Sequence, residues 1–265
     1  MSWDLIKEIV KSYKKNRSLH MRNNRQQFFW GSLALFCLAI GGWRCSKAGS
    51  TQTTTSVTYV AVINAAPYGP SADIYLNGTI VSSSGGIAPG NYSEEYATFA
   101  PGNYDVKFDK TGTDSVLYDI AASSFDTAGF YTLILYNASP GGTGVIDAAK
   151  ITDNFSSTSQ TTANYRFFNL SPDVPSCDLY FNGTLVQTQR APADNASNLL
   201  FDAFQTVAPN SYTIVAKVSG GDSVLATTST GINLSTGNVF TIFLSGTNTA
   251  SGGNHLAINI MQAVF

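Results

Sequence analysis

The sequence predicts an all-β protein with two tandem antiparallel β-sandwich domains after an N-terminal signal or anchor helix. Only 12% of the residues are charged, about half the usual share, so long amphipathic helices are disfavoured. Short apolar or alternating stretches separated by Gly, Pro and Asn turns favour strands instead. The phrase PSADIYLNGT, which starts at Pro70, recurs as PSCDLYFNGT from Pro175, and this repetition indicates a duplicated domain.

The N-terminal segment, residues 1–45, differs in composition from the rest of the chain. Nine of the fifteen basic residues lie in positions 1–47, and most of them precede the apolar stretch 28–43. This stretch is shorter than the roughly 20 residues that a membrane-spanning helix needs, and a basic region before a short apolar core is typical of a secretory signal. We therefore interpret residues 1–45 as a signal peptide or lipoprotein signal. A signal of ordinary length would begin at Met21, which is the alternative start of the protein.

A candidate lipidation site, Cys45, follows the apolar stretch. The Cys-Ser-Lys sequence at 45–47 resembles the start of a mature Bacteroidetes-type lipoprotein, whose first cysteine carries lipid. Residues 46–56 are mostly Ser, Thr, Gly and Gln and are predicted to form a flexible tether. These features predict an exported protein held on the outer membrane or cell surface by a lipid anchor. Small residues usually precede a lipidated cysteine, whereas the bulky Trp43 and the charged Arg44 stand here. The alternatives are therefore an uncleaved anchor helix or a periplasmic or secreted protein.

The remaining sequence limits the chemistry that the protein can perform. From Ala48 onward there are six basic and fifteen acidic residues, and this net charge of −9 argues against a nucleic-acid partner. Cys177 is the only cysteine and His255 the only histidine of that part, too few for a metal site with His and Cys ligands. The sequence has no G-x-S-x-G motif, and its carboxylates are scattered rather than paired. We therefore expect no catalytic residues, no metal and no cofactor.

The repetition sets the domain boundaries. Nine residues between Asn64 and Thr79 recur 105 positions later, and downstream motifs recur at slightly larger offsets, as short loop insertions would cause. A period of this length has the size of a whole domain rather than of a solenoid repeat. The sequence therefore predicts a first copy at 57–153, a linker at 154–163 and a second copy at 164–265.

Each copy has the pattern of a strand-rich domain. Apolar and polar residues alternate over 72–76 and again over 177–181, which predicts strands with one buried and one outward face. The Asn-Gly pairs at 77–78 and 182–183 are typical of two-residue hairpin turns, and Cys177 is predicted to be buried in the second core. Further strands are predicted at Tyr59–Ile63, Tyr96–Phe99, Tyr104–Phe108, Val116–Ile120, Tyr131–Tyr136 and Val145–Ile151. Short strands in this number indicate a sandwich.

The order of these motifs is similar to that of a known family. Each copy has a strand ending in Asn, an Asp-x-Tyr-x-Asn-Gly hairpin, an Ala-Pro-x-x-Tyr segment and a late Tyr/Phe-Thr strand. This pattern resembles domain-of-unknown-function family 4397 over both copies. The resemblance implies immunoglobulin-like sandwiches in secreted or lipid-anchored bacterial envelope proteins, with no established activity and no catalytic residues to carry over.

One candidate binding surface lies on the predicted outward faces of the two hairpins. Its residues are Asp73, Tyr75, Asp178 and Tyr180. Aromatic side chains beside carboxylates are suited to stacking against sugars, so an envelope glycan or protein is the expected partner. The alternative is that each Asp bonds turn backbone and each Tyr reflects strand propensity.

Three hydroxyl residues are candidate O-glycosylation sites. They are Ser115, Thr127 and Ser223. Each follows an Asp and precedes an apolar residue, which resembles the acceptor sequence of Bacteroidetes envelope O-glycosylation. The alternative is a plain turn that enters a strand.

Together these features predict a non-enzymatic cell-envelope protein whose two modules act in binding or as a surface spacer. The membrane is an expected partner through the lipid anchor or the N-terminal helix. A subunit of a surface fibre or pilus is the alternative, and a carbohydrate-active enzyme is a less favoured one.

Overall fold

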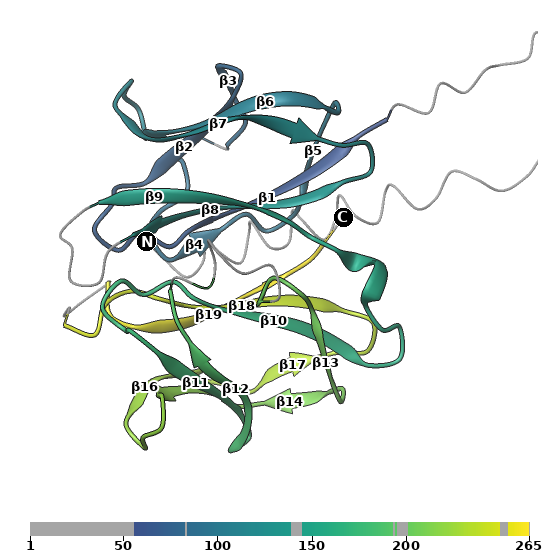
Figure 1. Cartoon of the computed structure of the whole chain (residues 1–265), viewed down its shortest axis with the longest axis vertical. Coiled ribbons are helices and arrows are strands. Elements are labelled where there is room, and N and C mark those ends of the chain that lie inside the picture. Colours follow the sequence, from purple (N-terminus) through teal and green to yellow (C-terminus); the bar gives the residue numbers. More distant parts are fainter. Residues whose placement is uncertain are drawn as a thin grey trace, which may run out of the picture. The chain divides into compact units, whose positions relative to one another are not determined.

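The structure, a computed structural model, describes residues 56–82, 84–138, 145–192, 194, 201–249 and 254–264. In these residues the chain forms strands β1 to β19 and one 3-10 helix, η1, so the predicted all-β class is confirmed (Figure 1). No helix of this part is long and apolar enough to cross a bilayer. The predicted signal segment, Met21, Cys45 and the tether up to residue 55 lie outside the described residues.

The strands of the two copies follow one another along the chain. Those of the first copy are β1 Thr58–Asn64, β2 Ala72–Leu76, β3 Thr79–Ile80, β4 Asn91–Tyr92, β5 Ala97–Phe99, β6 Gly102–Lys110, β7 Val116–Phe125, β8 Phe130–Asn137 and β9 Ile146–Thr152. Helix η1 is Phe155–Ser157. Those of the second copy are β10 Ala163–Asn169, β11 Cys177–Phe181, β12 Thr184–Arg190, β13 Gln205–Val207, β14 Asn210–Tyr212, β15 Ile214–Val218, β16 Val224–Thr227, β17 Ile232–Leu234, β18 Val239–Ser245 and β19 Ala257–Gln262. Every strand predicted by its residue range is confirmed.

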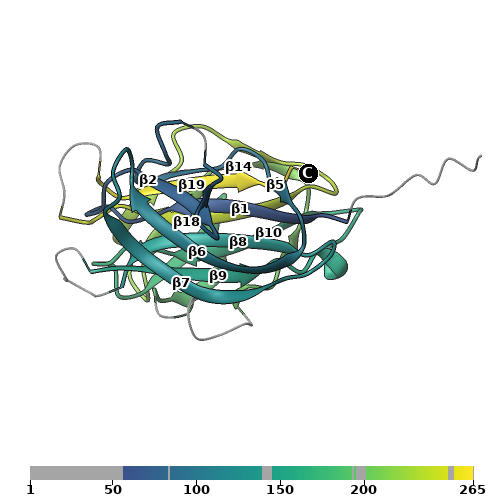
Figure 2. The same ribbon diagram turned by 90° about the horizontal axis from the view of Figure 1, so that it is seen from above.

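Each copy folds into two facing sheets with the same strand order. Figure 1 shows the sheets as layers, and Figure 2 looks down onto them. In the first copy one sheet is β4-β1-β8-β9, with β5 also paired to β1, and the other is β3-β2-β6-β7. In the second copy the sheets are β13-β10-β18-β19 and β12-β11-β15-β16, and β14-β17 adds a ribbon. The predicted β-sandwich architecture is therefore confirmed.

One pairing in each copy differs from the antiparallel expectation. Strand β1 runs parallel to β8, with Val60 opposite Tyr131, and β10 runs parallel to β18, with Tyr165 opposite Phe240. Parallel neighbours need a long connection, and the strands in between supply it in each copy. Alternation in a sequence marks the two faces of a strand but not the direction of its neighbour, which is why the pattern did not predict these pairs.

The phrase repeated in the sequence forms the hairpins β2-β3 and β11-β12. The turn residues Asn77 and Gly78 have φ angles of 46° and 74°, and Asn182 and Gly183 have 48° and 80°. Positive φ at both central residues is what a type I′ turn requires, and Asn-Gly adopts it readily. The inward residues of both hairpins are at most 3% exposed: Ala72, Ile74, Leu76, Cys177, Leu179 and Phe181. The predicted turns and inward faces are confirmed.

Three hydrophobic clusters hold the described part together. One fills the first sandwich and another the second. The third lies on the other face of the sheets that contain β1 and β10, and joins Ala61 and Ile63 to Phe168 and Phe243. Both sandwiches accordingly belong to one unit, Thr53–Phe265. Because these clusters lie wholly within this unit, we expect a fragment of residues 48–265 to fold by itself.

A buried ion pair lies at this third cluster. Arg166 Nη1 is 2.6 Å from Asp153 Oδ1, and both side chains are 0% exposed. The hydroxyls of Tyr96 and Thr132 each donate to Asp153 Oδ2 at 2.7 Å. The Arg166 guanidinium also donates to the hydroxyls of Thr132, at 3.0 Å, and Thr241, at 2.9 Å. Because Asp153 and Thr132 come from the first copy and Arg166 from the second, the network fixes the two copies against each other.

The first prediction concerns Cys177, which is a buried free thiol, as the sequence predicts. Burial, offset only in part by nearby Arg190, raises the pKa of the thiol to about 12. Little reactive thiolate is then present at neutral pH, and reagents cannot reach the sulfur. We expect a maleimide to leave the native fragment of residues 48–265 unmodified and to label it fully in denaturant, as measured by mass spectrometry. Rapid labelling in native buffer would contradict the placement of this residue.

The second prediction concerns the ion pair between the copies. Replacement Arg166→Met leaves the Asp153 carboxylate buried without its cation, and we expect it to lower the free energy of unfolding by about 3–5 kcal/mol. Urea unfolding followed by circular dichroism measures this change. Lys217→Met is the control, because Lys217 pairs with Asp222 at 3.7 Å on the surface, where ion pairs contribute little. Equal losses in the two variants would show that the buried pair is no stronger than a surface pair.

Candidate functional site

The two carboxylates predicted as binding residues, Asp73 and Asp178, are buried rather than accessible. Each is 6% exposed. Asp73 accepts hydrogen bonds from the hydroxyls of Ser82 and Thr111, both at 3.4 Å, and from the Gly112 N–H at 3.1 Å. The expectation of an accessible outward carboxylate is wrong, because the turn after β6 and the segment after β3 fold over Asp73.

Asp178 is held in the same way in the second copy. It accepts hydrogen bonds from the Gln189 N–H at 2.8 Å, from the Gly220 N–H at 3.1 Å and from the Ser219 hydroxyl. Burial by itself raises the pKa of this carboxyl, but the three hydrogen bonds outweigh burial and bring the pKa below its ordinary value. Both carboxylates therefore tie turns to the hairpins, which is the alternative that the sequence left open.

The two tyrosines of the predicted binding surface are half-buried on the outer sheets. The Lys107 ammonium lies 5.5 Å from the centre of the Tyr75 ring, and the Lys217 ammonium lies 4.8 Å from that of Tyr180. Such contacts are attractive because the ring face is electron-rich. A cation thus lies over one face of each ring that the sequence offered for stacking on sugars.

The other motif residues that recur in both copies also form hydrogen bonds that stabilise the fold. Asn64, at the end of β1, donates to the carbonyls of Pro70 and Ile87, and Asn169 does the same at the end of β10 with Val174 and Arg190. In the Ala-Pro-x-x-Tyr segments, each tyrosine hydroxyl donates to the carbonyl of the alanine four residues earlier, at 2.8 Å in the first copy and 2.7 Å in the second. The repetition therefore preserves hydrogen bonds that close loops.

The three candidate glycosylation sites lie in turns. Ser115 precedes β7, Thr127 lies between β7 and β8, and Ser223 precedes β16. All three residues are exposed, and their accessibility suits an enzyme that would modify them.

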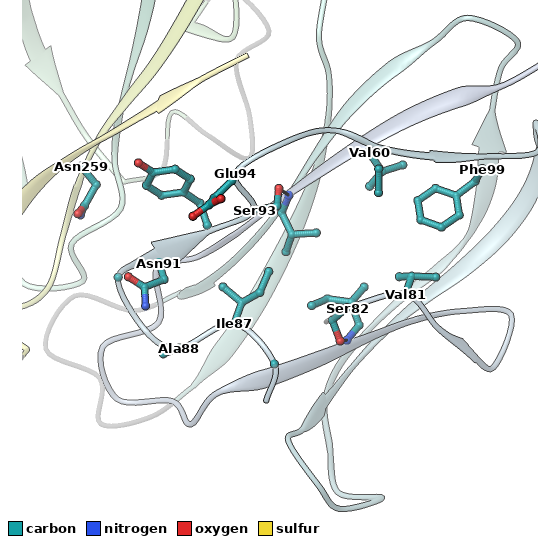
Figure 3. Close-up of a pocket in the computed structure, with 16 residues that line it drawn as sticks. Val60, Val81, Ser82, Ile87, Ala88, Asn91, Ser93, Glu94, Phe99 and Asn259 are labelled. Atoms are coloured by element: carbon teal, nitrogen blue, oxygen red, sulfur yellow. Dashed lines mark hydrogen bonds between the residues drawn. The ribbon is translucent and has the colours of Figure 1, made fainter. Parts of the chain in front are cut away.

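A cavity of about 850 Å³ lies between the two sheets of the first copy, and Asn259 from β19 of the second copy also lines it (Figure 3). Its walls carry apolar side chains from both sheets and from the segment that follows β3: Val60, Val62, Ile74, Val81, Ile87 and Phe99. The sequence analysis did not single out these residues. A pairwise comparison of side-chain size between the two copies is the signal that would have found them.

Polar residues line the rest of the cavity, among them Asn91 and Glu94, which are exposed. Near this rim, the Tyr92 hydroxyl donates to the Ile260 carbonyl at 2.6 Å. Burial, and then the charge of Glu94, raise the pKa of Tyr92 above its ordinary value. Among the residues that the structure describes, the cavity therefore combines apolar side chains with one negative charge at its rim, an arrangement that can bind a molecule but has no pair of charged groups for acid–base chemistry.

Comparison with known families identifies part of the chain. Residues 58–180 match the family model described as "Domain of unknown function (DUF4397)". The match begins at β1, covers every strand of the first copy and ends at Tyr180 in β11. The resemblance inferred from the motifs is thus confirmed over this range. No curated protein shows significant similarity to the chain.

The third prediction tests the role of Asp178 in the fold. Asp178→Asn removes the charge that three donors solvate, and we expect it to lower the free energy of unfolding by about 1.5–3 kcal/mol at neutral pH. Because the folded pKa lies below the unfolded one, this stabilisation is present above about pH 4 and disappears as the pH falls through the folded pKa. The difference between wild type and variant, measured by urea unfolding, should therefore shrink in acid. Asp222→Asn, at a fully exposed carboxylate, is the control that should change little at either pH.

Proposed function

We propose that this member of the DUF4397 family, to which residues 58–180 belong, is a non-enzymatic cell-envelope protein whose two sandwiches form a binding module. The observation that carries the binding role is the cavity of the first copy, which has an apolar interior and exposed polar residues at its rim. Such a cavity is unnecessary in a protein that acts only as a spacer. Pockets of this composition are typical of small-molecule sites.

The non-enzymatic assignment rests on the chemistry of the cavity and of the motifs. Glu94 is the only acidic or basic side chain among the described residues that line the cavity. Glycoside hydrolysis by the usual route requires two carboxylates on opposite sides of the substrate. Asp73 and Asp178, the carboxylates that recur in the two copies, are bound to backbone and hydroxyl groups of nearby turns.

The envelope location rests on the sequence that precedes the fold. A basic region, a short apolar stretch and Cys45 resemble a lipoprotein signal, and a polar segment of residues 46–56 separates it from β1. A lipid anchor at Cys45 would place the binding module on the outer membrane or cell surface.

A surface fibre or pilus subunit is the second candidate. Subunits that assemble by strand exchange complete each other's sheets, whereas both sandwiches here are built from strands of the same chain. Size-exclusion chromatography of residues 48–265 separates the two proposals. We expect a single discrete species, and ladders or filaments would favour the fibre.

The fourth prediction concerns Cys45. If it is acylated, two or more acyl chains hold the protein on the membrane, since each buried methylene contributes about 0.8 kcal/mol. We expect metabolic labelling with an alkyne fatty acid to tag the wild-type protein, and Cys45→Ala to remove the tag and release the protein or block its processing. Cys177→Ala is the matched control and should keep the tag. An untagged protein in the membrane fraction would indicate an uncleaved anchor, and an untagged soluble one would indicate ordinary secretion.

A further inference from the structure

The cavity exists because the first copy has small residues where the second has large ones. Strands β1 and β10 occupy equivalent places, since each pairs in parallel with the late strand of its own sandwich. Val60 and Val62 of β1 correspond to Tyr165 and Phe167 of β10. Tyr165 and Phe167 are 3% and 0% exposed and lie in the core cluster of the second sandwich. At these two positions the first copy has less side-chain volume.

The opposite wall of the cavity also has a smaller side chain in the first copy than in the second. Ser82, after β3, corresponds to Gln187 in β12. The Gln187 amide lies 3.5 Å from the Tyr165 hydroxyl, so large side chains of the second copy meet across the space that stays open in the first. Phe99 is an exception, because its counterpart Val207 is smaller, and the Phe99 ring lines the cavity.

The serine oxygens in the walls already accept hydrogen bonds from the backbone. The Ile74 N–H donates to Ser82 Oγ at 3.1 Å, and the Val62 N–H donates to Ser93 Oγ at 3.0 Å. Ser93 lies between β4 and β5, so its hydroxyl replaces the strand hydrogen bond that is interrupted there. A ligand inside the cavity therefore meets apolar side chains such as Val62 and Phe99, and groups such as the Asn91 amide and the Ser93 hydroxyl offer it polar contacts.

Charge narrows the class of ligand further. Glu94 at the exposed rim is the only acidic or basic residue among the described lining residues, so an anion would meet a like charge and no cation. Any ion that entered the apolar interior would also lose its hydration without a partner to replace it. The volume of about 850 Å³ lies in the usual range for sites that enclose small organic ligands.

We propose that the cavity of the first copy is a binding site for a small, uncharged, largely apolar molecule. This assignment rests on the proposed binding function and names the ligand class for it. In the second copy the corresponding positions carry Tyr165, Phe167 and Gln187, which are all buried.

The test uses the fragment of residues 48–265 and two fluorescent probes of similar size. N-phenylnaphthylamine is uncharged, and anilinonaphthalene sulfonate is its anionic relative. We expect saturable binding of one uncharged probe per chain, with the anionic probe at least about tenfold weaker. Glu94→Gln should reduce this difference by strengthening the binding of the anion, with little effect on the uncharged probe.

Cavity-filling variants identify the site. Val62→Phe introduces the residue that the second copy has at this position, and Ala88→Phe fills the cavity from a different segment. Each should weaken binding of the uncharged probe at least about tenfold, because protein atoms replace the ligand's contacts. Val116→Phe adds similar volume at a position that is 53% exposed on β7 and should leave binding unchanged. Circular dichroism and urea unfolding verify that each variant folds.

Several results would overturn the proposal. They are an absence of saturable binding to the uncharged probe, binding that survives in folded Val62→Phe and Ala88→Phe, and equal or tighter binding of the anionic probe. None of these results would contradict the proposed location of the protein in the cell envelope, which the fatty-acid labelling tests separately. Conversely, binding of the probe by this cavity would stand even if Cys45 carried no lipid.

Discussion

The buried ion pair between Arg166 and Asp153 is the interaction on which the arrangement of the two sandwiches depends. An arginine at this depth is tolerated only with a partner of opposite charge, which Asp153 supplies, and the hydroxyls of Thr132 and Thr241 accept further hydrogen bonds from the guanidinium. The counterpart of Arg166 in the first copy is Ala61, which is also buried in the shared cluster. Two identical copies would place either two arginines or two alanines at these positions. Because the copies differ at this position, only the second has an arginine that pairs with the first, and the two sandwiches pack against each other in one arrangement.

The positions that the copies kept and those that they changed have different roles. Asn64 and Asn169 repeat the same loop-closing hydrogen bonds, and Asp73 and Asp178 repeat the same anchoring of turns. The polar residues that recur in both copies are therefore those that the fold requires, because buried polar groups must keep their hydrogen-bond partners. Positions that differ are where a function of one copy alone can arise.

The contrast between Val62 and Phe167 illustrates this point for the cavity. Both are inward residues of equivalent strands, and either fits an apolar strand pattern. A difference of one aromatic ring at such a position changes how much of the space between the sheets is filled, since interiors are close-packed, and the differences at Val60 and Ser82 act in the same direction. Both copies contribute to the shared cluster, whereas the cavity is lined mainly by the first.

The sequence by itself determined the strands, the Asn-Gly turns, the inward face that carries Cys177 and the family that residues 58–180 match, because these follow from local alternation and turn chemistry. It did not reveal the direction of β8 beside β1, although the apolar residues at both faces of β1 were a sign that both would be buried. The burial of Asp73 was also decided by tertiary structure, since a turn distant in sequence covers it. The same is true of the cavity, because an open space between sheets depends on the combined volume of side chains from several segments, and no single stretch of sequence contains that sum.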